Sequence, residues 1–64
     1  MRATHILTDI PQKIQEIYNI GNQVEVEADN SVGGGHFTLI NRDGKMVSMD
    51  AVELFGTDTL IQKI

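Results

Sequence analysis

Two short segments of alternating residues joined by an Asp43-Gly44 turn constrain the fold of this chain more than any other feature. Residues 36–40 ("HFTLI") and 45–49 ("KMVSM") each alternate with a period of two, which is typical of half-buried strands. An Asp-Gly pair between two such segments is a strong short-range signal for a β-hairpin. In the first segment Phe37 and Leu39 share one face, and in the second Val47 and Met49 alternate with Met46 and Ser48, so that Met46 and Met49 lie on opposite faces.

Further short strands are predicted on both sides of the hairpin. In "QVEVEA" (23–28) the apolar residues alternate with Glu25 and Glu27, which predicts a strand with both glutamates on its outward face. Residues 3–7 and 59–64 are also expected to be strands, and a short turn is expected at 50–52. Short strands with tight turns indicate a small antiparallel barrel or a strongly bent sheet.

One helix is predicted between the first two strands. The apolar residues of "TDIPQKIQEIYNIG" recur with helical spacing, at Ile10, Ile14, Ile17 and Tyr18. Asp9 with Gln12 resembles a capping box, and Pro11 is compatible with a first helical turn. Gly21 lies where a left-handed C-terminal cap is expected.

The size and composition of the chain limit its class. Sixty-four residues form one domain (1–64) with a small core, and the absence of cysteine excludes disulfides and thiolate metal sites. The net charge of −4 and five scattered basic residues argue against nucleic-acid binding, which depends on clustered Lys and Arg. No apolar run is long enough for a membrane, and no signal peptide is visible, so we expect a cytoplasmic protein.

The order of the predicted elements resembles that of SH3-like barrels, over roughly Ile20 to Phe55. "VSMDAVEL" (47–54) resembles the segment of SH3 domains in which a strand enters a single 3₁₀ turn, and "IGNQVEV" (20–26) resembles their opening strand. The resemblance implies a mainly β fold, an SH3-like small antiparallel barrel with one short N-terminal helix. The layout is also similar to that of small bacteriophage accessory proteins, which implies the host cytoplasm as the site of action.

The resemblance does not extend to the usual ligand of SH3 domains. That family holds proline-rich segments in a groove with aromatic walls, whereas this chain has Ser48 and Ala51 at the matching positions and no tryptophan. We therefore do not expect polyproline binding.

Three consecutive glycines, Gly33, Gly34 and Gly35, raise the question of a phosphate-binding loop. A P-loop requires a following Lys-Ser or Lys-Thr pair, and a dinucleotide-binding loop opens a helix; here His36 and a predicted strand follow. We interpret the glycines as a structural joint and His36 as a solvent-facing strand residue.

Three aspartates, Asp43, Asp50 and Asp58, are interpreted as turn or cap residues. We expect no catalytic residue, no metal site and no cofactor.

Glu25 and Glu27 have two interpretations, which the sequence leaves open. The charges either protect the edge of a sheet or form an acidic patch for a basic partner. The residues that we expect to contact a partner are Gly33, Gly34, Gly35, His36, Glu25 and Glu27.

These observations favour a small non-enzymatic protein-protein interaction module. Its partner is an unidentified protein, and the resemblance to bacteriophage proteins implies a host or defence protein that it binds or inhibits. The first alternative is a homo-oligomer with a ligand site at the shared interface, a common solution for a chain with so small a core. A nucleic-acid-associated barrel is the least favoured alternative because of the acidic charge.

Overall fold

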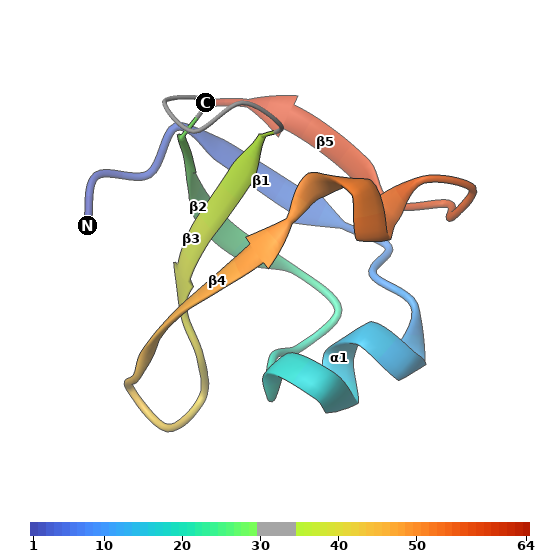
Figure 1. Cartoon of the computed structure of the whole chain (residues 1–64), viewed down its shortest axis with the longest axis horizontal. Coiled ribbons are helices and arrows are strands. Elements are labelled where there is room, and N and C mark those ends of the chain that lie inside the picture. Colours follow the sequence, from blue (N-terminus) through green and yellow to red (C-terminus); the bar gives the residue numbers. More distant parts are fainter. Residues whose placement is uncertain (30–34) are drawn as a thin grey trace.

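A single antiparallel sheet dominates the computed structural model, which describes residues 1–29 and 35–64 (Figure 1). Within these residues five strands follow the order β4-β3-β2-β1-β5, and every pair of neighbours is antiparallel. An α-helix connects β1 to β2, and a 3₁₀ turn follows β4. The elements are β1 (His5–Thr8), α1 (Gln12–Tyr18), β2 (Val24–Asp29), β3 (His36–Ile40), β4 (Met46–Asp50), η1 (Ala51–Leu54) and β5 (Leu60–Lys63).

The inner face of the sheet carries the core, as the period-two alternation predicted. The pairing register aligns Val26 with His5, and Phe37 with Met49, so the apolar residues of successive strands share one face. Among the described residues nine apolar side chains are buried, and every element except β5 contributes at least one. They are Leu7, Ile10, Ile14, Ile20, Val26, Phe37, Leu39, Met49 and Leu54.

The predicted mainly β class with one short N-terminal helix is confirmed, but the sheet is not closed. The strands β4 and β5 stand at its two ends, each with one neighbour. The strand β2 lies in the interior of the sheet, between β1 and β3. The interpretation of Glu25 and Glu27 as protection of a sheet edge is therefore wrong, because β2 is not a terminal strand: Glu25 is paired with Ile6 of β1 and Glu27 with Thr38 of β3.

Both predicted caps of the helix are wrong. The helix begins at Gln12, after Pro11, and Asp9 adopts a left-handed conformation (φ 57°) three residues earlier. The residue before a proline is biased away from helical geometry, which explains why the helix does not extend back to Ile10. At the other end Asn19 (φ 56°) forms the left-handed cap in place of Gly21.

The later start of the helix also changes its inward stripe. Ile10 is buried, but it precedes the helix, and Ile14 is the buried residue of α1. Ile17, which the helical spacing assigned to the same stripe, is 63% exposed. Seven residues form only two turns, so a helix this short buries one narrow strip of its surface.

The predicted Asp43-Gly44 turn is present between β3 and β4, and it offers a test of backbone conformation. Gly44 has φ 77°, with open space around the position of a Cβ atom. We expect Gly44→Ala to destabilise the protein by about 1–2 kcal/mol, because a left-handed conformation is unfavourable for residues with a Cβ. The midpoint of thermal unfolding measures this change.

Gly21 is the matched control for this substitution. Its backbone is not left-handed, and an added Cβ would lie 3.2 Å from the exposed, flexible guanidinium of Arg42. We expect Gly21→Ala to change the unfolding free energy by less than about 0.5 kcal/mol. Equal losses in the two variants would contradict the assignment of strain to Gly44.

Candidate functional site

Part of the predicted contact set comes together on the outer face of the sheet. Glu25 and Glu27 of β2 and His36 of β3 share this face, because Glu27 is aligned with Thr38, two residues from His36. Asp29, aligned with His36, adds a third carboxylate from β2. Gly35 enters β3 with φ 75°, as a structural joint requires, and Gly33 and Gly34 lie outside the described residues.

An ion pair on this face was missed by the sequence analysis. The Nδ1 atom of His36 lies 2.7 Å from Oδ1 of Asp50, its cross-strand partner in β4, and both side chains are partly exposed. Asp50 occupies the N-cap position of η1, as predicted, but its side chain makes no capping hydrogen bond there. The pair links β3 to β4 immediately before η1.

The two histidines lie on opposite faces of the sheet. His5 is aligned with the buried Val26 and is 6.4 Å from the ring of Phe37, on the inner face. His36 is on the outer face, so the two imidazoles are separated by the sheet. In residues 1–29 and 35–64 no group of three His, Asp or Glu side chains is arranged to hold a metal ion.

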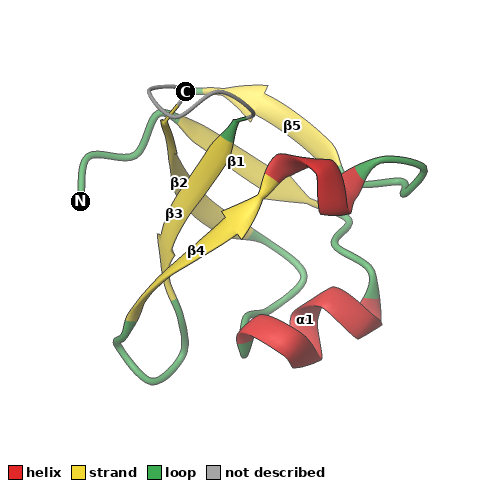
Figure 2. Ribbon diagram, viewed as in Figure 1, coloured by secondary structure: helices red, strands yellow, loops and turns green. Residues whose placement is uncertain are grey.

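A groove between α1 and η1 is a concavity with a mainly apolar lining. Its volume is about 390 Å³, and its lining combines apolar side chains with one cation and one carboxylate. In the view of Figure 2, α1 lies below η1. The lining residues are Pro11, Lys13, Ile14, Ile17, Glu53 and Thr57.

A hydrogen bond from Tyr18 to Glu53 joins the two helical elements beside this groove. The phenol of Tyr18 at the end of α1 donates to Oε2 of Glu53 in η1. Partial burial of Tyr18, this hydrogen bond and the negative charges of Glu53 and Asp50 together raise the pKa of the phenol to about 12. The bond therefore holds α1 and η1 together throughout the physiological pH range.

The segments that build the groove carry three large exposed apolar side chains, of which Ile17 lines the groove. Along the chain, Val52 directly precedes the lining residue Glu53. Phe55, which is 77% exposed, lies between the lining residues Glu53 and Thr57. The segments that build the groove, 9–18 and 50–58, contain five acidic residues and one basic residue, Lys13. The groove lining itself carries one charge of each sign, Lys13 and Glu53, and the other acidic residues belong to the segments that build it. Neither the exposure of Ile17 nor the contact between these segments was expected from the sequence.

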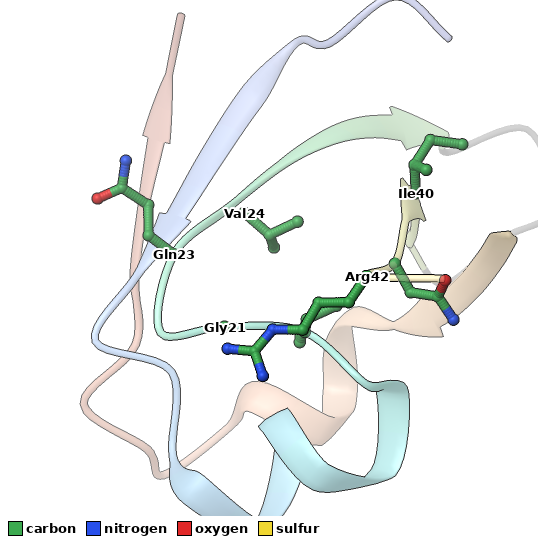
Figure 3. Close-up of a pocket in the computed structure, with 7 residues that line it drawn as sticks. Gly21, Gln23, Val24, Ile40 and Arg42 are labelled. Carbon is green, nitrogen blue, oxygen red and sulfur yellow. The ribbon is translucent and has the colours of Figure 1, made fainter. Parts of the chain in front are cut away.

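A second, shallower pocket of about 300 Å³ lies between the connection from α1 to β2 and the hairpin of β3 and β4 (Figure 3). The side chain of Arg42 extends over Gly21, where the absence of a Cβ leaves it room. In the described part of the chain this guanidinium has no hydrogen-bond or ion-pair partner. The other lining residues are Ile20, Gln23, Val24, Ile40 and Asn41. A single exposed cation over a shallow surface defines no particular ligand.

No protein-family model matches this chain, and neither the curated proteins nor the solved structures include a significant match. Within the described residues, no helix is long and apolar enough to cross a membrane.

Proposed function

We propose that this protein is a non-enzymatic interaction module that binds a partner protein in the groove between α1 and η1. The observation that carries the proposal is an exposed apolar side chain in the lining of this groove, Ile17, together with two exposed apolar residues, Val52 and Phe55, that lie within two positions of its lining residue Glu53. A buried aliphatic or aromatic side chain contributes about 1.5–3 kcal/mol relative to an exposed one, so covering these three residues would provide substantial binding energy. Exposed apolar clusters with polar rims are typical of contact surfaces.

The charge of the groove indicates the chemistry of the partner. With five acidic residues and one basic residue in the segments that form the groove, an acidic partner would be repelled and a basic one attracted. The proposed ligand is therefore a segment of apolar residues flanked by Lys or Arg. A proline-rich ligand is not proposed, because Ser48 and Ala51 replace the residues that would form an aromatic groove.

The strand order and the position of η1 support the narrower proposal of an SH3-like small barrel. In this arrangement β1 lies between β2 and β5, and a 3₁₀ turn connects β4 to the final strand. The layout of motifs similar to bacteriophage accessory proteins supports a host or defence protein as the partner, in the cytoplasm of the infected cell. That part of the proposal rests on the sequence resemblance alone.

A peptide-display selection against the isolated protein tests the proposed groove. We expect the selected peptides to combine apolar residues with Lys or Arg, and to shift the amide resonances of Ile17, Val52 and Phe55 in NMR spectra. In Ile17→Asp the same peptides should bind at least about tenfold more weakly, because a charge replaces an apolar contact. Ile17 is exposed, so the fold should be retained.

The double variant Glu25→Gln, Glu27→Gln is the matched control for that experiment. Both glutamates lie on the outer face of the sheet and do not line the groove. We expect it to bind the peptides as the wild type does. If this variant loses binding and Ile17→Asp retains it, the acidic face of the sheet is the contact surface and the groove proposal is wrong.

A further inference from the structure

We propose that two copies of this chain associate through their β5 strands, which pair antiparallel about a two-fold axis at Gln62. This inference concerns residues that do not line the groove and does not depend on the proposed function. It rests on the exposure of β5, the direction of its backbone groups, the self-complementarity of its side chains and its local charge.

The strand β5 is the least buried element of the fold. Its four residues are all exposed, and it contributes no residue to the core. Leu60 and Ile61, and Ile64 just beyond the strand, are three of the largest exposed apolar side chains in the described part of the chain. Figure 1 shows β5 in red beside β1, at one end of the sheet. An exposed edge strand with apolar side chains offers unpaired backbone groups to another strand.

The backbone of β5 presents hydrogen-bonding groups to a further strand. The amide of Ile64 donates to the carbonyl of Thr4 at 3.0 Å, so residue 64 faces β1. In an antiparallel strand the backbone N–H and C=O groups of successive residues point to opposite sides. Those of Gln62 and Leu60 therefore also point toward β1. The N–H and C=O groups of Ile61 and Lys63 therefore point outward, where no strand of the described chain receives them.

A second copy in antiparallel orientation satisfies these groups. When Gln62 lies opposite Gln62 of the second copy, Ile61 of each chain lies opposite Lys63 of the other and can exchange two backbone hydrogen bonds with it. Leu60 then lies opposite Ile64 of the second copy, and the two-fold symmetry forms this Leu60–Ile64 pair twice. In the neighbouring register centred on Ile61, Ile64 would instead lie opposite Asp58 of the second copy. The register centred on Gln62 therefore buries more apolar surface.

The local charge of β5 also favours a second copy as the occupant. The chain carries −4, so two copies repel each other at most surfaces. Residues 59–64 contain no acidic residue and a single base, Lys63, whose aliphatic stem can pack on Ile61 of the second copy. At the other edge of the sheet, β4 ends in Asp50. Two acidic chains therefore bring no carboxylate side chain of residues 59–64 together along β5.

A cysteine substitution tests the register directly, because the chain contains no cysteine. In the proposed dimer the two Gln62 residues form a non-hydrogen-bonded pair with Cα atoms about 4.5 Å apart, which is within the range for a disulfide. We expect Gln62→Cys to form a covalent dimer rapidly under mild oxidation. Ser48→Cys, an exposed position on the outer face of β4, is the matched control and should cross-link only slowly.

Sedimentation analysis of the wild type and of Leu60→Lys completes the test. We expect the wild type to reach twice the chain mass of 7.1 kDa as its concentration rises, and Leu60→Lys to dissociate at least about tenfold more readily. Leu60 is exposed, so circular dichroism should show an unchanged fold. A wild type that remains at the mass of one chain, or equal cross-linking rates for Gln62→Cys and Ser48→Cys, would overturn the proposal. Either result would leave the groove proposal intact, because that surface is tested by peptide binding.

Discussion

Met49→Ala should destabilise the protein by about 2–5 kcal/mol, the cost of removing a large apolar side chain from a closed core. Met49 is completely buried on the inner face of β4, among the other core residues. A domain of 64 residues has a total stability of about 3–10 kcal/mol, so this single change removes a large part of it. The midpoint of thermal unfolding should fall by at least about 10 °C.

Met46→Ala provides the matched control in the same strand. Met46 lies on the outer face of β4 and is 65% exposed, so the same chemical change removes few contacts. We expect a loss of less than about 0.5 kcal/mol. Urea titrations of the two variants, followed by circular dichroism, measure both values under identical conditions. Similar losses at the two positions would show that the inner and outer faces of β4 are assigned wrongly.

The ionisation of Tyr18 should occur at an unusually high pH in the folded protein. Burial and the carboxylate of Glu53 raise its pKa to about 12, from 10.0 for an unperturbed phenol. Because the chain has one tyrosine and no tryptophan, the ultraviolet absorbance of tyrosinate reports on this group alone. In denaturant the midpoint should return to about 10. In Glu53→Gln it should fall between these values, because the burial remains after the carboxylate is removed.

The raised pKa also makes stability depend on pH. Below pH 10 the phenol is protonated in both the folded and the unfolded chain, so its full contribution is present. Between pH 10 and 12 the unfolded chain releases the proton and the folded chain retains it, which favours unfolding. We expect a loss on the order of 1–2 kcal/mol across this range, reduced from the full value because Tyr18 is partly exposed. Tyr18→Phe should abolish this slope, and a slope that persists in that variant would assign it to other groups.

The strands and their inward faces could be predicted because they depend on local alternation. A period of two assigns Val26, Phe37, Leu39 and Met49 to one side of an extended chain, whichever strands become their neighbours. The hairpin turn was equally predictable, since Gly44 adopts the left-handed conformation that its Asp-Gly pair indicates. The start of the helix was not predicted correctly. The restriction that Pro11 imposes on Ile10 outweighed the apparent capping box.

The candidate site was less predictable because it depends on contacts between distant segments. The groove joins α1 to η1, and the Tyr18–Glu53 hydrogen bond across it links residues 35 positions apart. The exposure of Ile17 follows from how α1 packs, and no spacing along the chain reveals it. The predicted residues Glu25, Glu27 and His36 do share a face, as alternation requires, but they do not line the groove.

The sequence by itself determined the β class, the positions of most strands, the hairpin and the acidic charge, because these properties arise from neighbouring residues. Only the tertiary structure decided that β2 is an interior strand, that His36 pairs with Asp50, and that β5 remains an exposed edge. Strand order and register follow from the lowest free energy of the whole packed chain. A segment of sequence carries its own conformational preference, but it does not specify which distant segment will cover it.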